Sequence, residues 1–339
     1  SAASDVYKRQ TVLRFLSAAY SILPGTRLLD GETPLKKRPI KPLIDALLEL
    51  GADITYLGEE GYLPFRIVCK ELQGGELSIE QNISSQFVSA LMMIGPFLKK
   101  GLVINRSGVL RSDSYIELTR QMLKDLSLKV EGENERIELF PSTVNKKNYE
   151  IESDWSSAVY WMAFVCMIPN AKVTLKGLFP ESKQGDKKLL NVLIPFGLKY
   201  TWEDQDLILT NTLSKPEHFE CDCTSFPDQA QTLAFLCAGL GVSCVLRGLE
   251  TLSFKETDRI KAIHYELNKM GVTSHYTDSE LSFSGKVLVK KLTIDTYNDH
   301  RMAMAGALMG VQHDIRINDP SVVSKSYPNF WNDLKTFTT

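Results

Sequence analysis

Apolar and polar positions follow one another in a pattern that occurs four times along the chain. In each copy a short apolar segment is followed by a charged loop and by a half-apolar helix that ends near Leu-Gly. Two more apolar segments with the alternation of paired strands complete the copy. The spacing predicts strands at 27–29, 102–105, 172–175 and 244–247 as the first strand of each copy, and helices at 39–50, 114–126, 187–196 and 257–270.

A second set of helices has a different pattern, because small and apolar residues surround the helix on all sides. A helix without a polar face is expected to be buried. Each begins with Ser, Thr or Asp, residue types that cap helix N-termini, and the positive end of the helix dipole favours anions there. The five predicted inner helices begin at Thr11, Ser84, Ser156, Asp228 and Asp299.

The order strand, helix, strand, helix and paired strands predicts an α/β fold of repeated βαβαββ units, with buried helices inside and sheets over them. A length of 339 residues exceeds one ordinary core and favours two domains. Because the segment 141–149 is polar and lacks periodicity, we expect a first domain at 11–150 and a second at 151–339. Residues 1–10 are polar and precede a helix without a strand, so we interpret them as a leader foreign to the fold.

The composition and the absence of certain motifs argue against several classes of function. With 39 Lys and Arg against 41 Asp and Glu, the net charge is −2, which excludes an overall basic surface for nucleic acid. No apolar run is long enough to span a membrane. Cys221 and Cys223 lack a second ligand pair, so we expect no metal site, and the remaining cysteines read as free thiols of a cytoplasmic protein. Nucleotide-loop, dinucleotide and serine-hydrolase motifs are absent, which predicts no cofactor.

Basic residues stand at several predicted helix starts, where a cation opposes the helix dipole unless an anion binds nearby. Arg14 and Arg301 each lie one turn or less into an apolar helix. Individually they fit surface charge; together they indicate a site for phosphate and carboxylate groups, balanced by acidic residues elsewhere. In the run 255–259, Thr257 is a candidate helix cap, whereas Lys255 and Arg259 could instead face a ligand with Glu256 as a proton donor.

Three other polar groups are candidates for either a structural or a functional role. Asp228 is either the cap of an apolar helix or a general base at the mouth of a pocket. Ser84, Ser85 and Gln86 either cap a helix or donate hydrogen bonds to a phosphate or polyol. His300, within the run 297–301, fits a structural role.

Several of these strings together resemble the family of EPSP synthase, 3-phosphoshikimate 1-carboxyvinyltransferase. The resemblance runs from about Thr11 to the C-terminus, and its most specific parts are KETDR at 255–259 and YNDHRMAM at 297–304. KRPI at 37–40, SSQF at 84–87, Pro-Asp at 227–228 and SKSYP at 324–328 match in the same order. The resemblance implies the two-domain enolpyruvyl transferase fold, an inverse α/β barrel. It also implies transfer of the enolpyruvyl group of phosphoenolpyruvate to the 5-hydroxyl of shikimate 3-phosphate, a step of aromatic amino-acid biosynthesis.

The resemblance also implies roles for particular residues. Asp228 resembles the base, Glu256 the acid, and Lys255 the cation beside them. The expected ligands of shikimate 3-phosphate are Ser84, Ser85, Gln86, Ser112, Tyr115, Asp228 and Lys255. Those of phosphoenolpyruvate are Arg38, Gln86, Arg259, Arg301 and Lys325. The partners would be these two small molecules. The protein would be a monomer whose two domains close on them.

The start of the chain departs from the family. The family begins with a strand and a Lys-Ser motif followed by an Arg, and an Asn-Ala-Gly turn precedes the segment matching Thr11; here Lys8-Arg9-Gln10 stands before it. We therefore expect a truncated chain that has little or no activity as written. The alternatives are the enolpyruvyl transferase acting on UDP-N-acetylglucosamine and a non-catalytic anion-binding protein of the same fold.

Overall fold

The computed structural model describes residues 10–80, 85–107, 113–133, 135–144, 148 and 150–338. The chain divides into two compact units, residues 1–149 and residues 150–339, each with its own hydrophobic core. Residues 1–9 of the expected leader lie outside the described part, whereas Gln10 is the first residue of helix α1. We call residues 1–149 unit 1 and residues 150–339 unit 2.

The described residues of unit 1 form two sheets, with strand orders β1-β3-β2 and β4-β5-β7-β6. Only the β4–β5 pair is parallel; the other pairs of the two sheets are antiparallel. Helices α1 and α4 pack against each other, with buried side chains on both. The elements are α1 (Gln10–Ile22), β1 (Thr26–Leu29), α2 (Thr33–Lys36), α3 (Lys41–Glu49), β2 (Asp53–Tyr56), β3 (Phe65–Val68), β4 (Gly75–Glu80), α4 (Ser85–Ile94), η1 (Gly95–Phe97), β5 (Leu102–Ser107), α5 (Asp113–Asp125), β6 (Val130–Gly132) and β7 (Arg136–Leu139).

Unit 2 begins with inner helix α6 and has sheets of order β8-β10-β9, β11-β12-β14-β13 and β15-β16. The pairs β11–β12 and β15–β16 are parallel. The first half of the unit contains α6 (Trp155–Met167), β8 (Lys172–Leu175), η2 (Gly185–Lys188), α7 (Leu189–Val192), η3 (Ile194–Phe196), β9 (Leu198–Glu203), β10 (Asp206–Asn211) and β11 (His218–Asp222). The second half contains η4 (Pro227–Gln229), α8 (Ala230–Leu240), β12 (Ser243–Arg247), η5 (Leu252–Phe254), α9 (Arg259–Lys269), β13 (Thr273–Tyr276), β14 (Glu280–Ser284), β15 (Lys291–Ile294), α10 (His300–Gly306), η6 (Ala307–Val311), β16 (Asp314–Ile317), η7 (Pro320–Lys325) and α11 (Phe330–Thr338).

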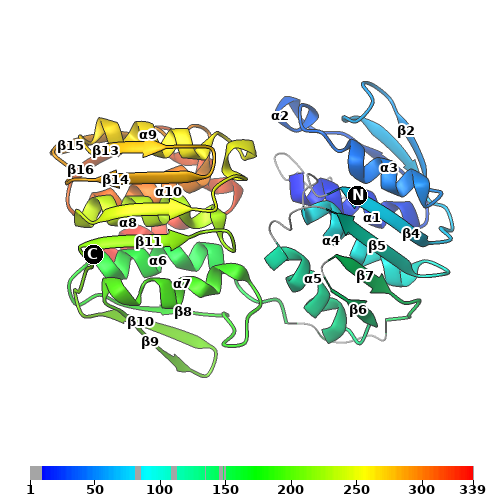
Figure 1. Ribbon diagram of the computed structural model, residues 1–339, viewed down its shortest axis with the longest axis horizontal. Helices are drawn as coiled ribbons and strands as arrows, with labels where there is room; N and C mark the ends of the chain where they lie inside the picture. Colours follow the sequence, from blue (N-terminus) through cyan, green and yellow to red (C-terminus); the bar gives the residue numbers. More distant parts are fainter. Residues whose placement is uncertain are drawn as a thin grey trace. The chain divides into compact units, whose positions relative to one another are not determined.

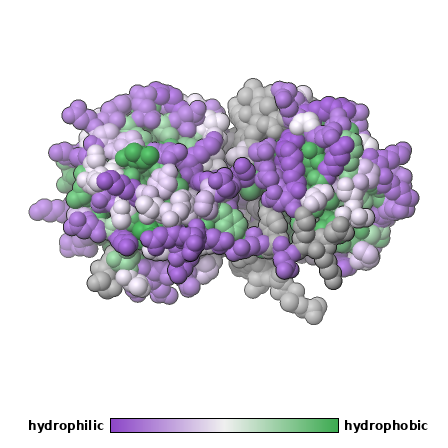
Figure 2. Space-filling view, turned by 90° about the horizontal axis from the view of Figure 1, so that it is seen from below, coloured by the Kyte–Doolittle hydropathy of each residue, from purple (hydrophilic) through white to green (hydrophobic). Residues whose placement is uncertain are grey.

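The prediction of buried inner helices is confirmed in unit 2. Every side chain from Ala158 to Met167 is buried in α6, and the same holds from Ala230 to Ala238 in α8. Helix α8 contacts both α6 and α10, and Figure 1 shows the three helices lying together with strands of the sheets across them. Hydrophilic side chains dominate the face shown in Figure 2, as expected when apolar side chains fill the interior. The α/β fold of repeated units around buried helices is therefore confirmed.

Two details of the sequence prediction are wrong. The expected outer helix at 187–196 is divided into η2, α7 and η3, because Pro195 cannot donate a backbone hydrogen bond and stops the helix before it. Thr257 does not cap the next outer helix. Helix α9 begins two residues later, at Arg259, and Asp258 is its cap, accepting a hydrogen bond from the backbone amide of Lys261. Asp258 can do so because its side chain lies one residue before the first turn.

The loops that lead to the candidate site approach each other closely. Gly248 has φ +75°, and a Cβ placed on it would lie 2.3 Å from Thr224 Oγ1. A side chain at this position would therefore displace the loop between β11 and η4. In the turn before α10, Tyr297 and Asn298 both have left-handed backbones, with φ of 53° and 57°. The Tyr297 hydroxyl donates to Glu266 Oε1 at 2.7 Å, which ties this turn to α9.

Candidate active site

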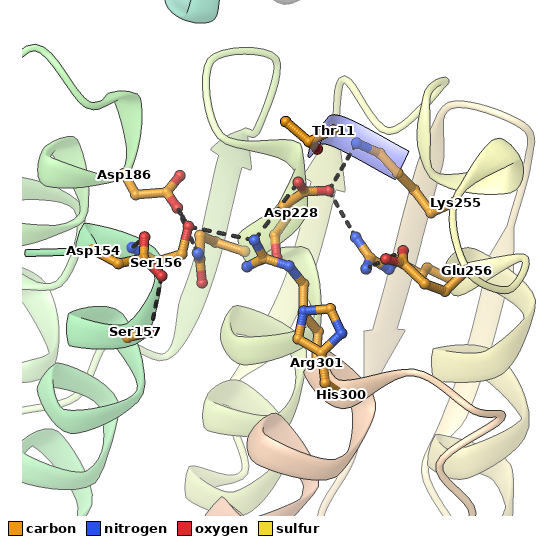
Figure 3. A network of polar contacts seen from close by, with 12 residues as sticks. Thr11, Asp154, Ser156, Ser157, Asp186, Asp228, Lys255, Glu256, His300 and Arg301 are labelled. Atoms are coloured by element: carbon orange, nitrogen blue, oxygen red, sulfur yellow. Dashed lines mark hydrogen bonds and ion pairs between the residues drawn. The ribbon is translucent and has the colours of Figure 1, made fainter. Parts of the chain in front are cut away.

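Arg259 lies at the centre of a charged cluster in unit 2, as the first residue of α9 with a side chain that is 1% exposed. Its Nη1 donates to Asp228 Oδ1 at 2.7 Å, and its Nη2 donates to Glu256 Oε2 at 2.8 Å. Its Nε donates to Asp299 Oδ2 at 2.6 Å. Figure 3 shows Asp228 and Glu256 in this cluster, with Lys255 beside Asp228. One planar group with several fixed donors thus joins three carboxylates from three segments of the chain.

Asp228 lies in η4, directly before α8, and several cations surround it. Lys255 Nζ is 3.1 Å from Oδ1, and Arg301 Nη2 is 3.7 Å from Oδ2. Burial alone would raise the pKa of this carboxyl, but the charges of Lys255, Arg301 and Arg259 outweigh it and hold the pKa well below its usual range. Asp228 is therefore an ionised hydrogen-bond acceptor, and it does not act as the side-chain cap that was one reading of the sequence.

Glu256 pairs with Lys325 Nζ at 2.5 Å through Oε1 and with Arg259 through Oε2. Lys325 is the last residue of η7, so the C-terminal segment delivers this cation. Burial would raise the pKa of the Glu256 carboxyl, but Arg259 and Lys325 hold it well below its usual range. Glu256 is ionised in this arrangement, and a role as proton donor requires a change in the charges around it.

The start of α10 supplies the third part of the cluster. Asp299 is fully buried and caps the helix, accepting from the backbone amide of Arg301 at 2.9 Å. The Arg301 side chain turns back to Asp228, where Nη1 donates to the backbone carbonyl at 3.2 Å. A cation at this position would oppose the helix dipole, and the adjacent carboxylates offset that cost.

His300 lies between these charges and is largely buried. Burial first, and then the charge of Arg301, lower the pKa of His300 to about 4. Its ordinary value in an unfolded chain is about 6.5, so the unfolded chain takes up the proton at a higher pH than the folded chain does. The structural role expected from the sequence agrees with a neutral, buried imidazole.

Acidification from pH 7 to pH 5 is accordingly expected to lower the free energy of unfolding by about 2 kcal/mol through His300 alone. The loss begins as the pH falls through the unfolded value and is complete below about pH 4. A His300→Gln variant should show a flatter dependence over this window in urea unfolding followed by circular dichroism. Equal pH dependence in both proteins would show that His300 is not responsible.

A fourth carboxylate belongs to the cluster and was not predicted. Asp186, in η2, is buried and accepts hydrogen bonds from Ser156 Oγ and Gln229 Nε2. Figure 3 shows Asp186 beside Ser156, on the side of the cluster opposite Glu256. The sequence carried little signal for it, because one Asp in a charged loop before a helix fits an exposed residue equally well.

The structure also corrects the expected distribution of charge. The cations at the predicted anion site were expected to be balanced by acidic residues elsewhere. In unit 2 the carboxylates of Asp228, Glu256 and Asp299 lie among those cations, at salt-bridge distance from Arg259. Buried cations require such partners, because an unpaired charge away from water is costly.

Unit 1 places part of its predicted site residues at the starts of α1 and α4. Arg14 Nη1 donates to Gln86 Oε1 at 2.8 Å, and Gln86 Nε2 donates to Thr11 Oγ1 at 3.1 Å. Arg38 Nη1 donates to Gln10 Oε1 at 2.5 Å. Burial and then the charge of Arg38 lower the pKa of Arg14 to about 10. Two neighbouring guanidinium groups of this kind can hold an anion between them.

The structure describes only some of the other site residues predicted in unit 1. Ser85 is the first residue of α4, and Tyr115 lies in the first turn of α5 with a half-exposed side chain. Ser84 and Ser112, which the sequence assigned to shikimate 3-phosphate, lie outside the described residues. Among the residues that the structure does describe, no helix is long and apolar enough to cross a membrane, and no group of three or more His, Cys, Asp and Glu could hold a metal ion.

Solved structures of similar fold were found by comparison. A structure of EPSP synthase from Acinetobacter baumannii matches with a TM-score of 0.77 at 22% identity, covering 96% of this chain and 76% of that one. A second structure of the enzyme from the same organism matches with a TM-score of 0.76. The fold is thus that of the enolpyruvyl transferases.

Comparisons of sequence narrow the class to one family. The family profile of EPSP synthase (3-phosphoshikimate 1-carboxyvinyltransferase) matches residues 6–334. The 3-phosphoshikimate 1-carboxyvinyltransferase of Bacteroides fragilis (strain YCH46) is 40% identical over 336 residues, covering 98% of this chain and 82% of that protein. The protein of the same name from Sulfurovum sp. (strain NBC37-1) is 34% identical over 333 residues, covering 97% and 77%. The chain belongs to the EPSP synthase family.

Proposed function

We propose that this chain transfers the enolpyruvyl group of phosphoenolpyruvate to the 5-hydroxyl of shikimate 3-phosphate, releasing phosphate. Membership of the family supports this function. The structural observation that carries it is the pairing of Asp228 and Glu256 across one buried guanidinium group, that of Arg259. Two carboxylates held apart by a fixed cation can serve opposite faces of a reacting group as base and acid.

In the proposed addition step, Asp228 accepts the proton of the 5-hydroxyl while Glu256 gives a proton to the methylene carbon of phosphoenolpyruvate. The double bond breaks, and the hydroxyl oxygen bonds to the central carbon. In the elimination step, Glu256 takes back a proton from the new methyl group and the double bond forms again. The bond to phosphate breaks as Asp228 gives its proton to the leaving phosphate. The ionised state of Asp228 suits a proton acceptor, and Lys255 at 3.1 Å offsets charge that develops there.

Glu256 needs a proton before it can act as an acid. Lys325 and Arg259 now hold its pKa low. The phosphate and carboxylate of phosphoenolpyruvate would compete for those same cations and bring negative charge close to Glu256. Both effects raise the pKa of a carboxyl group. Substrate binding would therefore supply the protonated acid that the addition requires.

This mechanism predicts that phosphoenolpyruvate binds with net uptake of protons near pH 6. The expected uptake is a substantial fraction of one proton, because the pKa of Glu256 rises toward the working pH. Titration calorimetry on the chain saturated with shikimate 3-phosphate, repeated in buffers of different ionisation enthalpy, measures it. A Glu256→Gln variant is the control and should lose the uptake. Equal uptake in both proteins would contradict the assignment of Glu256.

The function itself is tested by sequential calorimetric titration with shikimate 3-phosphate and then phosphoenolpyruvate, followed by an assay for released phosphate. Binding of both with turnover supports the proposal. Binding without turnover would favour a non-catalytic anion-binding protein of the same fold. Binding of UDP-N-acetylglucosamine in place of shikimate 3-phosphate would assign the chain to the other enolpyruvyl transferase.

Further residues would bind the two substrates. Gln86 and Arg38 of unit 1 would join Arg259, Arg301 and Lys325 in binding phosphoenolpyruvate. Ser84, Ser85, Gln86, Ser112 and Tyr115 would bind shikimate 3-phosphate with Asp228 and Lys255. We also propose that the chain acts as a monomer in the cytoplasm; its six free cysteines fit a reducing compartment.

A further inference from the structure

Asp186 is a buried carboxylate whose role is not accounted for by the reaction described above. The residue is 7% exposed, although it lies in a short 3₁₀ turn rather than in a helix of the core. The two groups that donate to its Oδ2 are neutral: the hydroxyl of Ser156 and the amide of Gln229, the latter at 2.7 Å. A neutral acceptor would satisfy both donors at a lower desolvation cost, so the presence of a carboxylate needs a reason.

One of its partners leads to Arg301. Ser156 Oγ donates to Asp186 and accepts from Arg301 Nη2 at 3.3 Å. A hydroxyl has a single hydrogen, so its donation to Asp186 turns a lone pair toward the guanidinium group. Arg301 Nη1 meanwhile donates to the carbonyl of Asp228. The two terminal nitrogens of Arg301 are thus held by different segments of the chain.

The other partner leads to Asp228. Gln229 is fully buried and is the next residue after Asp228 in η4. Its Nε2 donates to Asp186, and its Oε1 accepts from Thr232 Oγ1 at 3.2 Å. The amide is held at both ends, which restricts the rotation of the turn that carries Asp228. Asp186 therefore contacts the starts of α6 and of the η4–α8 segment, and reaches the start of α10 through one hydroxyl.

The charges agree with this geometry. The pKa of Asp186 is raised above its ordinary value, chiefly by burial, although the charge of Arg301 and the bonds from Ser156 and Gln229 act to lower it. The nearby charge of Asp228 raises it again, and by reciprocity Asp186 raises the pKa of Asp228. A second negative charge on this side moderates the effect of the cations on the proposed base.

We propose, on the basis of the function assigned above, that Asp186 is a positioning residue of the transfer reaction. It orients the Arg301 guanidinium group toward the anionic groups of phosphoenolpyruvate through Ser156, and it fixes the turn of Asp228 through Gln229. When Arg301 exchanges its contact with Asp228 for a substrate anion, the link through Ser156 still holds the other nitrogen. The carboxylate strengthens that link, since hydrogen bonds to ionised acceptors are the stronger class.

The first test measures the freedom of Arg301 without any substrate. Phenylglyoxal modifies arginine, and peptide mapping by mass spectrometry gives the rate at Arg301 alone. In Asp186→Asn, which preserves shape and removes charge, we expect that rate to increase about tenfold, corresponding to one lost charge-assisted hydrogen bond. Asp154→Asn is the matched control, because Asp154 caps the same helix α6 through Ser156 N and Ser157 Oγ. The control should leave the rate unchanged.

The second test uses phosphoenolpyruvate itself. Calorimetry in the presence of shikimate 3-phosphate should give a Kd for phosphoenolpyruvate about tenfold higher in Asp186→Asn than in the unsubstituted chain. If Asp186 acts through Arg301, the effects of Asp186→Asn and Arg301→Lys should not add in the double variant. Ser156→Ala breaks the same link while keeping Asp186, and should reproduce the increase in the modification rate of Arg301.

These outcomes separate the two proposals. An unchanged modification rate at Arg301 in both Asp186→Asn and Ser156→Ala would overturn the positioning role. Additive effects in the double variant would do the same. Failure of the unsubstituted chain to bind phosphoenolpyruvate would contradict the proposed function, while the modification rates would still decide the role of Asp186. If Asp186→Asn does not fold, Ser156→Ala provides the decisive rate.

Discussion

Replacing Arg259 by methionine is expected to lower the free energy of unfolding by about 3–5 kcal/mol and to abolish activity. The side chain is 1% exposed, and it donates to Asp228, Glu256 and Asp299. Methionine fills a similar volume but leaves these carboxylates without their shared donor. Because an uncompensated buried charge is more costly than a lost surface contact, the loss should be visible in urea unfolding followed by tryptophan fluorescence.

The control for this experiment is Arg247→Met. Arg247 also bridges two carboxylates, Glu220 at 2.8 Å and Glu280 at 3.0 Å, but its side chain is 51% exposed. Water and ions replace such partners readily, so its loss should be far smaller. Arg259→Lys should fall between the two, since an ammonium group keeps the charge without the planar set of donors. Equal losses for Arg259→Met and Arg247→Met would show that the buried cluster contributes little to stability.

Replacing Asp228 by asparagine is expected to lower kcat by about 10²–10⁴-fold, the usual contribution of a positioned base. Asparagine preserves the shape of the side chain but cannot accept the hydroxyl proton. The affinity for shikimate 3-phosphate should change little, because Lys255 remains in place and the asparagine side chain can still form a hydrogen bond at this position. Phosphate release gives kcat, and calorimetry gives the affinity.

Asp222→Asn is a matched control on the same loop. Its carboxylate accepts from the backbone amide of Thr224 at 2.9 Å, a turn contact at the end of β11. The same chemical change at this position should leave turnover close to that of the unsubstituted chain. Unchanged turnover in Asp228→Asn would remove Asp228 as the base, whereas equal losses in both variants would point to a general disturbance of the loop.

The inner helices could be predicted from the sequence because their pattern is extreme. A segment such as Ala158–Met167, apolar on all sides, fits only a buried helix. The broken outer helix was harder, because the residues around Pro195 retain helical spacing while proline interrupts the hydrogen bonds. The positions of the helices along the chain could thus be predicted, whereas the continuity of this outer helix depended on one residue, Pro195.

Part of the candidate site could likewise be predicted from the sequence, and part could not. The sequence marks Lys255, Glu256, Arg259 and Arg301 as candidate site residues, because they stand in dense polar runs at predicted helix starts. That one guanidinium group joins three carboxylates could not be predicted, since Asp228, Glu256 and Asp299 come from segments whose proximity only the fold determines. Asp186 lacked even a local pattern, and its burial depends on packing against Gln229.

The left-handed pair Tyr297–Asn298 has a consequence for how unit 2 opens. Two successive residues in this backbone region are strained, and the bond from the Tyr297 hydroxyl to Glu266 helps to hold them. The first turn of α10 can therefore unwind only if this anchor in α9 is also released. Arg259 and Arg301 stand at the starts of those two helices. Local opening that frees one of these arginines should free the other, so the two helix starts behave as one cooperative unit of unfolding.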